Sequence, residues 1–435
     1  MQIEKQINRS RLFNAASLAL VVTAMTFAIR ANLLGTLGEE FGLTPAEIGE
    51  IASAAFWGFT LAMFVGGPLC DILGMKNMFF IAFISHIAGI ILTIYSGGYW
   101  LLFFSTLLVG IGNGFVESAS YAMVSSMYTE NKSEKLNYWH IWFPGGIVVG
   151  GLIAYLATLA GIGWKMQMAT MLPPALIYGF MFFRQRFPKS ERITMGVSNK
   201  EMIKACFRPL FIFMVCCMFL TAATELGTNQ WIVELLSNIG VPSILLLVFI
   251  NGIMVLGRSN AGILLKRMNS TGLLFLSAIF SFFGLLWLGY AQGYMAFAAA
   301  GVFAVGITFF WPTMIGFVSE KLPKTGPLGL SIMGGVGMLS VSLVLPVMGQ
   351  VYEEQLRLMV PDGFNLDVLR NAAIGTEEAV IWTRATVTAG ATTLRNASVL
   401  PGILIIAFGF LYFLRRKKTV AAVNKDGLSN LKNHL

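Results

Sequence analysis

Three charged side chains lie inside runs of apolar residues, and these are the groups best placed to do chemistry. Glu117 lies in the stretch GIGNGFVESASYAMVSSMY, Arg30 in the first apolar run and Glu225 in a later one. An ionised carboxylate is strongly disfavoured in hydrocarbon, so such a residue faces a partner or a cavity and often takes up a proton. We therefore expect Glu117 to exchange a proton. A structural carboxyl group bonded to a neighbouring helix is the alternative.

Glu225 opens a polar stretch within an apolar run. Residues 225, 228 and 229 share one face of an α-helix, so Glu225, Thr228 and Asn229 are expected to present polar groups together. Gln230 and Trp231 follow directly. Because a sugar requires hydrogen-bonding groups beside an aromatic plane, Glu225, Asn229, Gln230 and Trp231 are candidate binding residues. A polar clamp between two helices is the alternative.

Arg30 has three interpretations of equal weight. Its guanidinium group matches a substrate carboxylate, which it would bind through two parallel hydrogen bonds. It would equally well neutralise Glu117 or Glu225, or extend outward from the end of its helix toward the membrane surface. The charge of the substrate therefore stays undecided at this level.

The composition identifies the surroundings of these residues as a lipid bilayer. Of 435 residues, 56% are hydrophobic and 12% charged, whereas a soluble domain carries about 25% charged residues. Apolar stretches long enough to cross the bilayer, about 20 residues each, recur along the whole chain. They predict an all-α polytopic membrane protein with twelve transmembrane helices, at 11–34, 47–70, 78–96, 99–126, 137–159, 164–183, 209–236, 242–264, 271–290, 294–317, 326–350 and 396–415.

The distribution of positive charge predicts the orientation of these spans. With the N-terminus inside, the cytoplasmic segments hold 23 of the 30 Lys and Arg residues and the external loops hold 5, while Arg30 and Arg258 lie within spans. Because positive loops stay on the cytoplasmic side, we expect both termini in the cytoplasm. The net charge of +9 then reflects topology and anionic lipid, with no nucleic-acid partner.

Several other classes of function lack their sequence signatures. Four cysteines on the membrane or cytoplasmic side and three histidines without metal-ligand spacing predict neither disulfides nor a metal site. No cofactor is expected, and no enzymatic motif such as His-Glu-x-x-His or Gly-x-Ser-x-Gly occurs. No filter loop of a channel is visible. A receptor without transport activity and a drug exporter stay as alternatives.

The chain divides into two pseudo-symmetric halves. Six spans in residues 1–183 precede a charged linker at 184–208, and six follow in residues 209–435, which end in a basic cytoplasmic tail. The turn Gly67 to Lys76 has a counterpart in Gly262 to Arg267 at the corresponding place in the second half. Duplicated halves with a binding site between them are the layout of a secondary transporter.

The turn carries a family resemblance over essentially the whole chain. Its pattern Gly-x-Leu-x-Asp71-x-x-Gly74-x-Lys76, with twelve spans and a central cytoplasmic loop, resembles the major facilitator superfamily. The resemblance implies that these residues latch the inner gate, with Asp71 pairing with a basic group or capping a helix. Arg258 would belong to the matching gate of the second half.

Five short segments are similar to the fucose-permease type of sugar/proton symporter. They are Gly114 to Glu117, Leu136 to His140, residues 223–231, Phe310 to Thr313, and Gly334-Gly335 with Leu345 to Gly349. The resemblance implies that Glu117 is the proton-coupling group. In the fourth segment, Trp311 is a candidate to stack on a sugar ring, although a kink beside the cavity is the plainer interpretation. Trp139 and His140 line the inner mouth or are simply interfacial aromatics.

The first span departs from this pattern. It contains Phe27-Ala-Ile-Arg30-Ala-Asn32, which looks more like the anion:cation symporters that carry organic acids and makes Asn32 a further candidate for substrate binding. Tyr121-Ala122 stands where those sugar symporters often have Asn-Pro, so Tyr121 is a candidate too. An acidic sugar or another organic anion therefore stays open as substrate.

Together these patterns predict a proton-coupled symporter of the cell (inner) membrane that imports a sugar or sugar-like solute by alternating access, working as a monomer. An organic-anion symporter or exchanger is the first alternative, and an exporter of a drug or metabolite is the second. The external segment at about 351–395 is expected to be a flexible insertion, or else one or two short amphipathic helices over the outer opening.

Overall fold

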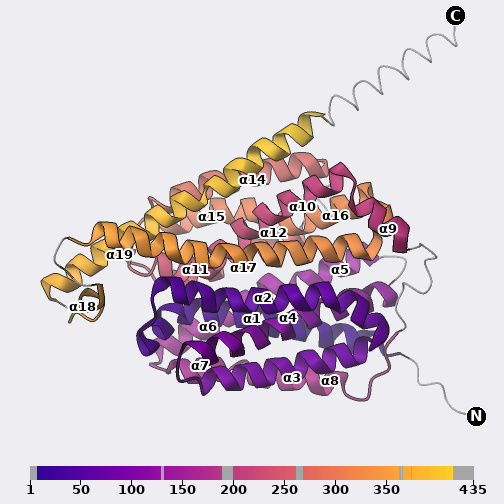
Figure 1. Cartoon of the computed structure of the whole chain (residues 1–435), viewed down its shortest axis with the longest axis horizontal. Coiled ribbons are helices and arrows are strands. Elements are labelled where there is room, and N and C mark those ends of the chain that lie inside the picture. Colours follow the sequence, from indigo (N-terminus) through magenta and orange to yellow (C-terminus); the bar gives the residue numbers. More distant parts are fainter. Residues whose placement is uncertain are drawn as a thin grey trace, which may run out of the picture.

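The chain folds into two helical bundles that lie against each other along the long axis of the molecule (Figure 1). The computed structural model describes residues 7–128, 132–188, 199–260, 268–361, 364, 366–373 and 375–414. The first bundle comprises α1 (Arg9–Phe41), α2 (Pro45–Ile72), α3 (Met75–Ile94), α4 (Tyr99–Met127), α5 (Lys132–His140), α6 (Trp142–Leu159), α7 (Trp164–Ala169) and α8 (Leu172–Phe182).

The second bundle follows α9 (Asn199–Cys206). It comprises α10 (Pro209–Ala222), the π-helical turn η2 (Ala223–Gly227), α11 (Thr228–Leu235), α12 (Ser243–Ser259), α14 (Ser270–Leu288), α15 (Met295–Ile307), α16 (Phe310–Lys321), the 3-10 turn η3 (Pro323–Thr325), α17 (Gly326–Met359), α18 (Leu366–Arg370) and α19 (Glu377–Ala397). After Ser398 the chain continues as helix through residues 399–414.

Ten segments of the described chain are long and apolar enough to cross a membrane. The other two predicted spans appear in shorter form. Residues 164–183 form α7 and α8, and the break comes where Pro173 and Pro174 start a new helix. The span at 242–264 is α12, whose 17 residues end at Ser259, and residues 261–267, with most of the second-half turn motif, lie outside the described residues.

The α1–α2 connection shows how local sequence sets the helix ends. Gly42 ends α1 in the left-handed conformation at φ 63°, which glycine adopts without strain. Thr44 then caps α2: its side chain accepts a hydrogen bond from the Glu47 amide, and Glu47 accepts one from the Thr44 amide. The result is a sharp reversal at one end of the bundle.

The turn between α2 and α3 has the glycine geometry that its motif predicts. Gly74 has φ 79° and precedes the first residue of α3, and Lys76 is exposed. The side chain of Asp71 lies outside what the structure describes, so its predicted latch role stays a prediction. Residues 189–198 of the linker and the basic tail at 415–435 also lie outside the described residues.

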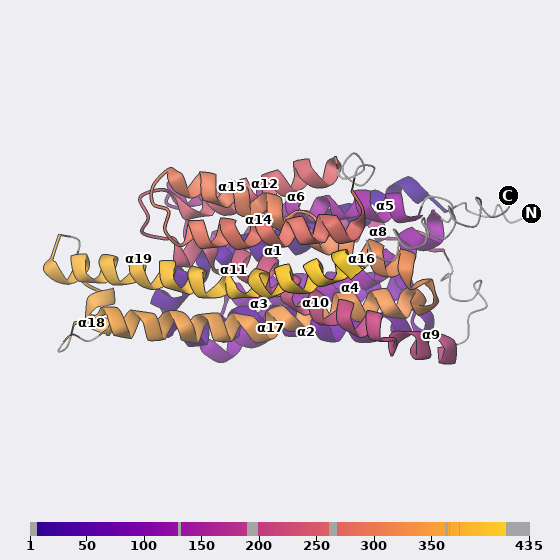
Figure 2. The ribbon, with the colours of Figure 1, turned by 90° about the horizontal axis from the view of Figure 1, so that it is seen from above.

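The two halves meet along an interface that we call the seam, in which α1, α2 and α6 pack against α11, α17 and α12 respectively. We name the two ends of the molecule by α18 and α9, which lie at opposite ends of its long axis (Figure 2). Two glycines allow backbones to touch across the seam. A Cβ atom on Gly49 would lie 2.9 Å from the Leu345 carbonyl oxygen, and one on Gly349 would lie 2.6 Å from that of Pro45. The halves are therefore closed together at these positions.

The segment predicted as a flexible insertion is helical, so that interpretation is wrong. Helix α17 runs on to Met359, α18 follows, and α19 starts at Glu377 with a Thr376 cap and two acidic residues in its first turn. Figure 2 shows α18 and the start of α19 extending beyond the rest of the bundle. Packing of α19 against α17, α11 and α14 stabilises this helix, which the sequence alone did not distinguish from a flexible insertion.

Candidate functional site

Arg30 lies in the middle of α1 and is only 6% exposed. Its Nη2 donates to Gln230 Oε1 at 2.8 Å and its Nε to the same oxygen at 3.3 Å. The guanidinium group also lies over the rings of Phe27 and Phe56, 5.2 and 5.7 Å from their centroids. Among the described residues, no carboxylate forms an ion pair with it. The outward-extending interpretation of Arg30 is therefore wrong, and so is pairing with Glu117 or Glu225.

Gln230 connects the two halves at this point, since it lies on α11 and Arg30 on α1. Its Nε2 donates back to the Phe27 carbonyl at 3.4 Å. The adjacent Asn229 is 2% exposed, and neither its amide nitrogen nor its amide oxygen has a hydrogen-bond partner. A buried amide without partners is costly, by about 1–3 kcal/mol. Asn229 is thus a group with unused hydrogen-bonding capacity next to Arg30's partner.

Glu225 lies in the π-helical turn between α10 and α11. A π turn shifts the phase of the side chains that follow it, so the shared face expected from α-helical spacing does not apply across this turn. Glu225 Oε1 accepts a hydrogen bond from Arg258 Nη2 at 2.9 Å, and Arg258 Nε donates to the Thr308 carbonyl at 2.9 Å. The structure therefore places Arg258, predicted as a gate residue, opposite a predicted substrate residue.

Because the Glu225–Arg258 pair is buried, removing one partner should be expensive. Arg258→Met should lower the free energy of unfolding by about 3–5 kcal/mol, since it leaves a buried carboxylate without its counter-charge. The double variant Arg258→Met/Glu225→Leu should recover most of that loss. Melting curves of the purified variants at pH 8 measure both, with the exposed Arg357→Met as control. A single variant that melts with the wild type would show that the pair contributes no stability.

Glu117 belongs to a hydrogen-bonded chain in the first half. The Tyr121 hydroxyl donates to Glu117 Oε1 at 2.9 Å and is hydrogen-bonded to Nε2 of His140 on α5. His140 Nε2 lies 3.6 Å from Glu117 Oε1. The Glu117 side chain is 2% exposed and that of His140 is 18% exposed, so the chain leads from a buried carboxyl group to a partly accessible imidazole.

The two polar clusters face each other across the seam. Arg258 lies close enough to act electrostatically on Tyr121 and His140. The Trp311 indole nitrogen, on α16, lies near the Tyr121 hydroxyl but is buried without a hydrogen bond. Tyr121 on α4, which is hydrogen-bonded to Glu117, thus lies within electrostatic range of Arg258, which pairs with Glu225 in the second half.

Two predicted binding residues have other partners. Asn32 Nδ2 donates to Gln167 Oε1 of α7 at 3.2 Å, within the first half. Trp231 Nε1 donates to the Leu345 carbonyl at 3.2 Å, and its ring lies against Gly49 and Gly349 in the closed seam. In this conformation Trp231 holds α11 to α17.

His140 is a member of the hydrogen-bonded chain with Tyr121 and Glu117 that its sequence context does not reveal. A histidine beside tryptophans near a helix end is typical of an interfacial aromatic residue, and only the packing of α5 against α4 brings it to Glu117. The sequence does give a signal for the contact between Glu117 and Tyr121: they are four residues apart, and such residues share a helix face.

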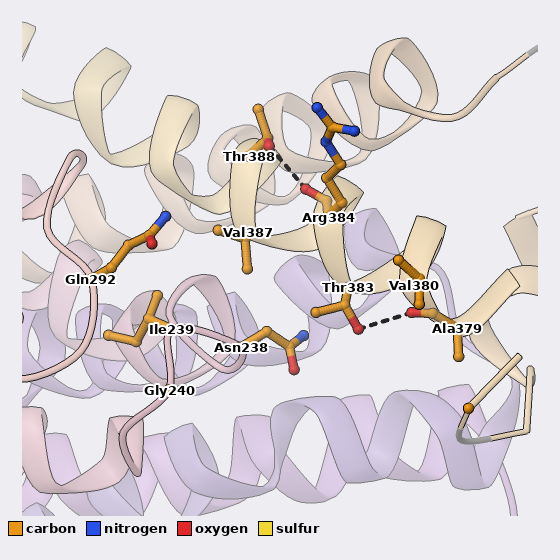
Figure 3. Close-up of a pocket in the computed structure, with 11 residues that line it drawn as sticks. Asn238, Ile239, Gly240, Gln292, Ala379, Val380, Thr383, Arg384, Val387 and Thr388 are labelled. Atoms are coloured by element: carbon orange, nitrogen blue, oxygen red, sulfur yellow. Dashed lines mark hydrogen bonds between the residues drawn. The ribbon is translucent and has the colours of Figure 1, made fainter. Parts of the chain in front are cut away.

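A groove at the α18 end contains none of these residues. Its volume is about 790 Å³, and it lies between α19 and the loop after α11 (Figure 3). Asn238 of that loop donates to Thr386 of α19 at 2.9 Å. The lining residues are Asn238, Ile239, Gly240, Gln292, Gly375, Ala379, Val380, Thr383, Arg384, Val387 and Thr388.

Comparison with known proteins gives one family match and several distant relatives. The family model described as Major Facilitator Superfamily matches residues 16–346. A probable chloroplastic anion transporter of Arabidopsis thaliana is 28% identical over 171 residues, covering 36% of this chain and 33% of that protein. A D-galactonate transporter of Escherichia coli is 25% identical over 205 residues (45% and 47%). A gentisate transporter of Corynebacterium glutamicum is 21% identical over 228 residues (49% and 50%). The chain thus spans half or less of the length of each of these relatives.

Solved structures agree with the fold over nearly the whole chain. An inward-facing bacterial homologue of the human lysosomal transporter Spinster superposes with a TM-score of 0.73 at 13% identity, covering 92% of this chain and 96% of that one. The xylose transporter XylE of Escherichia coli, in a partially occluded inward-open conformation, gives a TM-score of 0.67 at 12% identity (88% and 96%). At such identities the likeness concerns the fold alone.

Proposed function

The chain belongs to the major facilitator superfamily of secondary transporters, and from this premise we propose that it imports a hydroxylated organic anion together with protons. The observation that carries the proposal is the isolated charge of Arg30. Among the described residues, the buried guanidinium group has a neutral amide and two aromatic rings as its partners and no carboxylate as a counter-charge. A substrate carboxylate would supply that charge with matching geometry.

Asn229 and the relatives support the same substrate class. The amide of Asn229, which is buried without a hydrogen-bond partner among the described residues, would offer a hydrogen bond to a substrate hydroxyl group. Three of the relatives are named for anions, for galactonate and for gentisate, and the last two are hydroxylated organic acids, while other relatives are named for the neutral solutes myo-inositol and D-xylose. Of the two classes that the sequence left open, we therefore favour the organic acid over the neutral sugar.

The closed seam supports alternating access about this site. At Gly49 and Gly349 the backbones of α2 and α17 are in contact, so the two halves are closed together there. The Lys and Arg distribution favours an external α18 end and cytoplasmic termini. The structure would then represent the outward-closed conformation, in which the substrate leaves toward the α9 end.

We assign proton coupling to Glu117 and the path of the proton to its two neighbours. When Glu117 is protonated, its carboxyl proton would pass to the Tyr121 oxygen while the Tyr121 hydroxyl passes its own proton to His140 Nε2. Glu117 is then a carboxylate, Tyr121 is again a neutral phenol and His140 is an imidazolium, so the proton has moved to a side chain that is 18% exposed. Because α5 lies toward the α9 end (Figure 2), this path would release the proton into the cytoplasm.

The proposal predicts that substrate moves protons. Adding D-galactonate or gentisate to proteoliposomes that enclose a pH-sensitive dye should acidify the lumen, whereas D-galactose should not. Tyr121→Phe should lower the rate of this acidification by about 10²-fold, because it removes the hydroxyl that relays the proton.

Tyr155→Phe on α6 is the matched control for the relay, since Tyr155 belongs to neither polar cluster. It should acidify the lumen at the wild-type rate. Acidification by neither acid in the wild-type protein would overturn the symport proposal. A wild-type rate in Tyr121→Phe would remove Tyr121 from the proton path.

A further inference from the structure

Arg370, at the end of α18, reaches across the seam from the segment that joins α17 to α19. Its Nη1 donates to the carbonyl of Leu43 at 2.8 Å. Leu43 lies in the turn between α1 and α2 and is 5% exposed. The two residues are 327 positions apart, and they belong to opposite halves of the transporter.

Glycines on α1 make room for this contact. A Cβ atom on Gly38 would lie 2.7 Å from Arg370 Nη2 and 2.5 Å from Ile48 Cδ1 of α2, so the guanidinium group rests directly on the backbone of α1, beside Ile48. One turn earlier, a Cβ atom on Gly35 would overlap the carboxylate of Glu234, which belongs to α11 in the second half. Glu234 and Arg370 also attract each other electrostatically. The cation thus lies where the first half, the second half and α18 meet.

We propose that Arg370 is a latch that holds the α18 end of the transporter closed. The inference rests on the alternating access of the proposed function, in which the halves must part at this end to admit substrate. Parting removes Leu43 from Arg370, so the hydrogen bond exists in the closed conformation and is lost in the open one. A contact made in one state shifts the equilibrium toward that state by its own free energy.

The position of the latch gives α18 and α19 a role. Helix α18 packs against α19, and α19 packs against α17 and α11, so the second half carries α18 with it. The Arg370 side chain, which extends from α18 onto the α1–α2 turn, therefore joins two bodies that move relative to each other. An arginine suits this task because its fork bonds a carbonyl and keeps its charge near a carboxylate.

The latch can be tested by measuring the distance between the halves without any substrate. Spin labels at Glu40→Cys and Ser237→Cys, both exposed in the wild-type protein, would report the α18 end in a background in which Cys70, Cys206, Cys216 and Cys217 are serine. In lipid nanodiscs, Arg370→Gln should raise the ratio of long to short distances roughly tenfold, the size expected for one charge-assisted hydrogen bond.

Arg357→Gln is the matched control, because Arg357 lies on α17 and pairs with Glu353 of the same helix. The distances between its two spin labels should equal those in the labelled protein that keeps both arginines. Gly38→Ala should shift the ratio of long to short distances in the same direction as Arg370→Gln, because the added methyl group displaces the guanidinium group from α1 of the first half. An unchanged distribution in Arg370→Gln would overturn the latch, and if that variant does not fold, an unchanged Gly38→Ala distribution decides in the same way. Since no anion or proton gradient is involved, this result is independent of the symport test.

Discussion

Arg30→Gln should lower uptake of an organic acid by at least about 10²-fold. The substrate carboxylate would lose a buried, doubly hydrogen-bonded partner, and truncating one member of such a pair costs about 3 kcal/mol or more. Initial uptake of radiolabelled D-galactonate or gentisate into proteoliposomes measures the effect. The uptake rate of Arg30→Lys should lie between those of the wild type and Arg30→Gln, since an ammonium group keeps the charge but not the planar fork.

The stability of the same variant separates binding from folding. Because Arg30 is buried without a carboxylate partner among the described residues, replacing it with a neutral side chain should leave the melting temperature unchanged or raise it. Loss of transport with intact stability would assign Arg30 to the substrate. Unchanged uptake of every acid tested would place Arg30 in a structural role and leave the anion proposal without its main support.

Glu117→Gln should separate solute movement from proton movement. The amide keeps the size and the hydrogen bond to Tyr121 but neither gains nor loses a proton. Exchange of labelled for unlabelled substrate should therefore continue at a rate within about threefold of the wild type. Accumulation driven by a proton gradient should be lost: the ratio of internal to external substrate concentration should stay at one, whereas in the wild type it should rise about tenfold per pH unit of gradient.

The control for this variant is Glu353→Gln. Glu353 pairs with Arg357 on the same helix, at a distance from the proton chain, so its removal should leave both exchange and accumulation intact. Accumulation at the wild-type level in Glu117→Gln would take Glu117 out of the coupling mechanism, and Glu225, the carboxyl group paired with Arg258, would become the next candidate.

The architecture was predictable from sequence because the bilayer imposes it. A helix that crosses the hydrocarbon needs about 20 apolar residues, and this requirement predicted an all-helical polytopic fold, which the comparisons confirm. The failures have local causes. Pro173 and Pro174 break one span into α7 and α8, and the segment after α17 becomes helical through tertiary packing that its own pattern does not determine.

The candidate site was predictable only as a set of unpaired charges. Glu117, Glu225 and Arg30 are conspicuous in apolar surroundings, but their partners depend on how the halves pack. Gln230, which bonds Arg30, is 200 positions away in sequence. Glu225 pairs with Arg258, and Arg30 has no carboxylate partner in the part of the chain that the structure describes. This arrangement moves the proposed substrate from a neutral sugar toward an acid.

The most direct test of the central claim is the melting temperature of the purified protein with an acid and with its neutral counterpart. A ligand that binds the folded protein raises its melting temperature. D-galactonate should raise the melting temperature of the wild-type protein but not that of Arg30→Gln, and D-galactose should raise neither. If D-galactose stabilises the wild-type protein and no acid in a panel that includes galactonate and gentisate does, Arg30 is not the site of a substrate carboxylate and the protein carries a neutral solute.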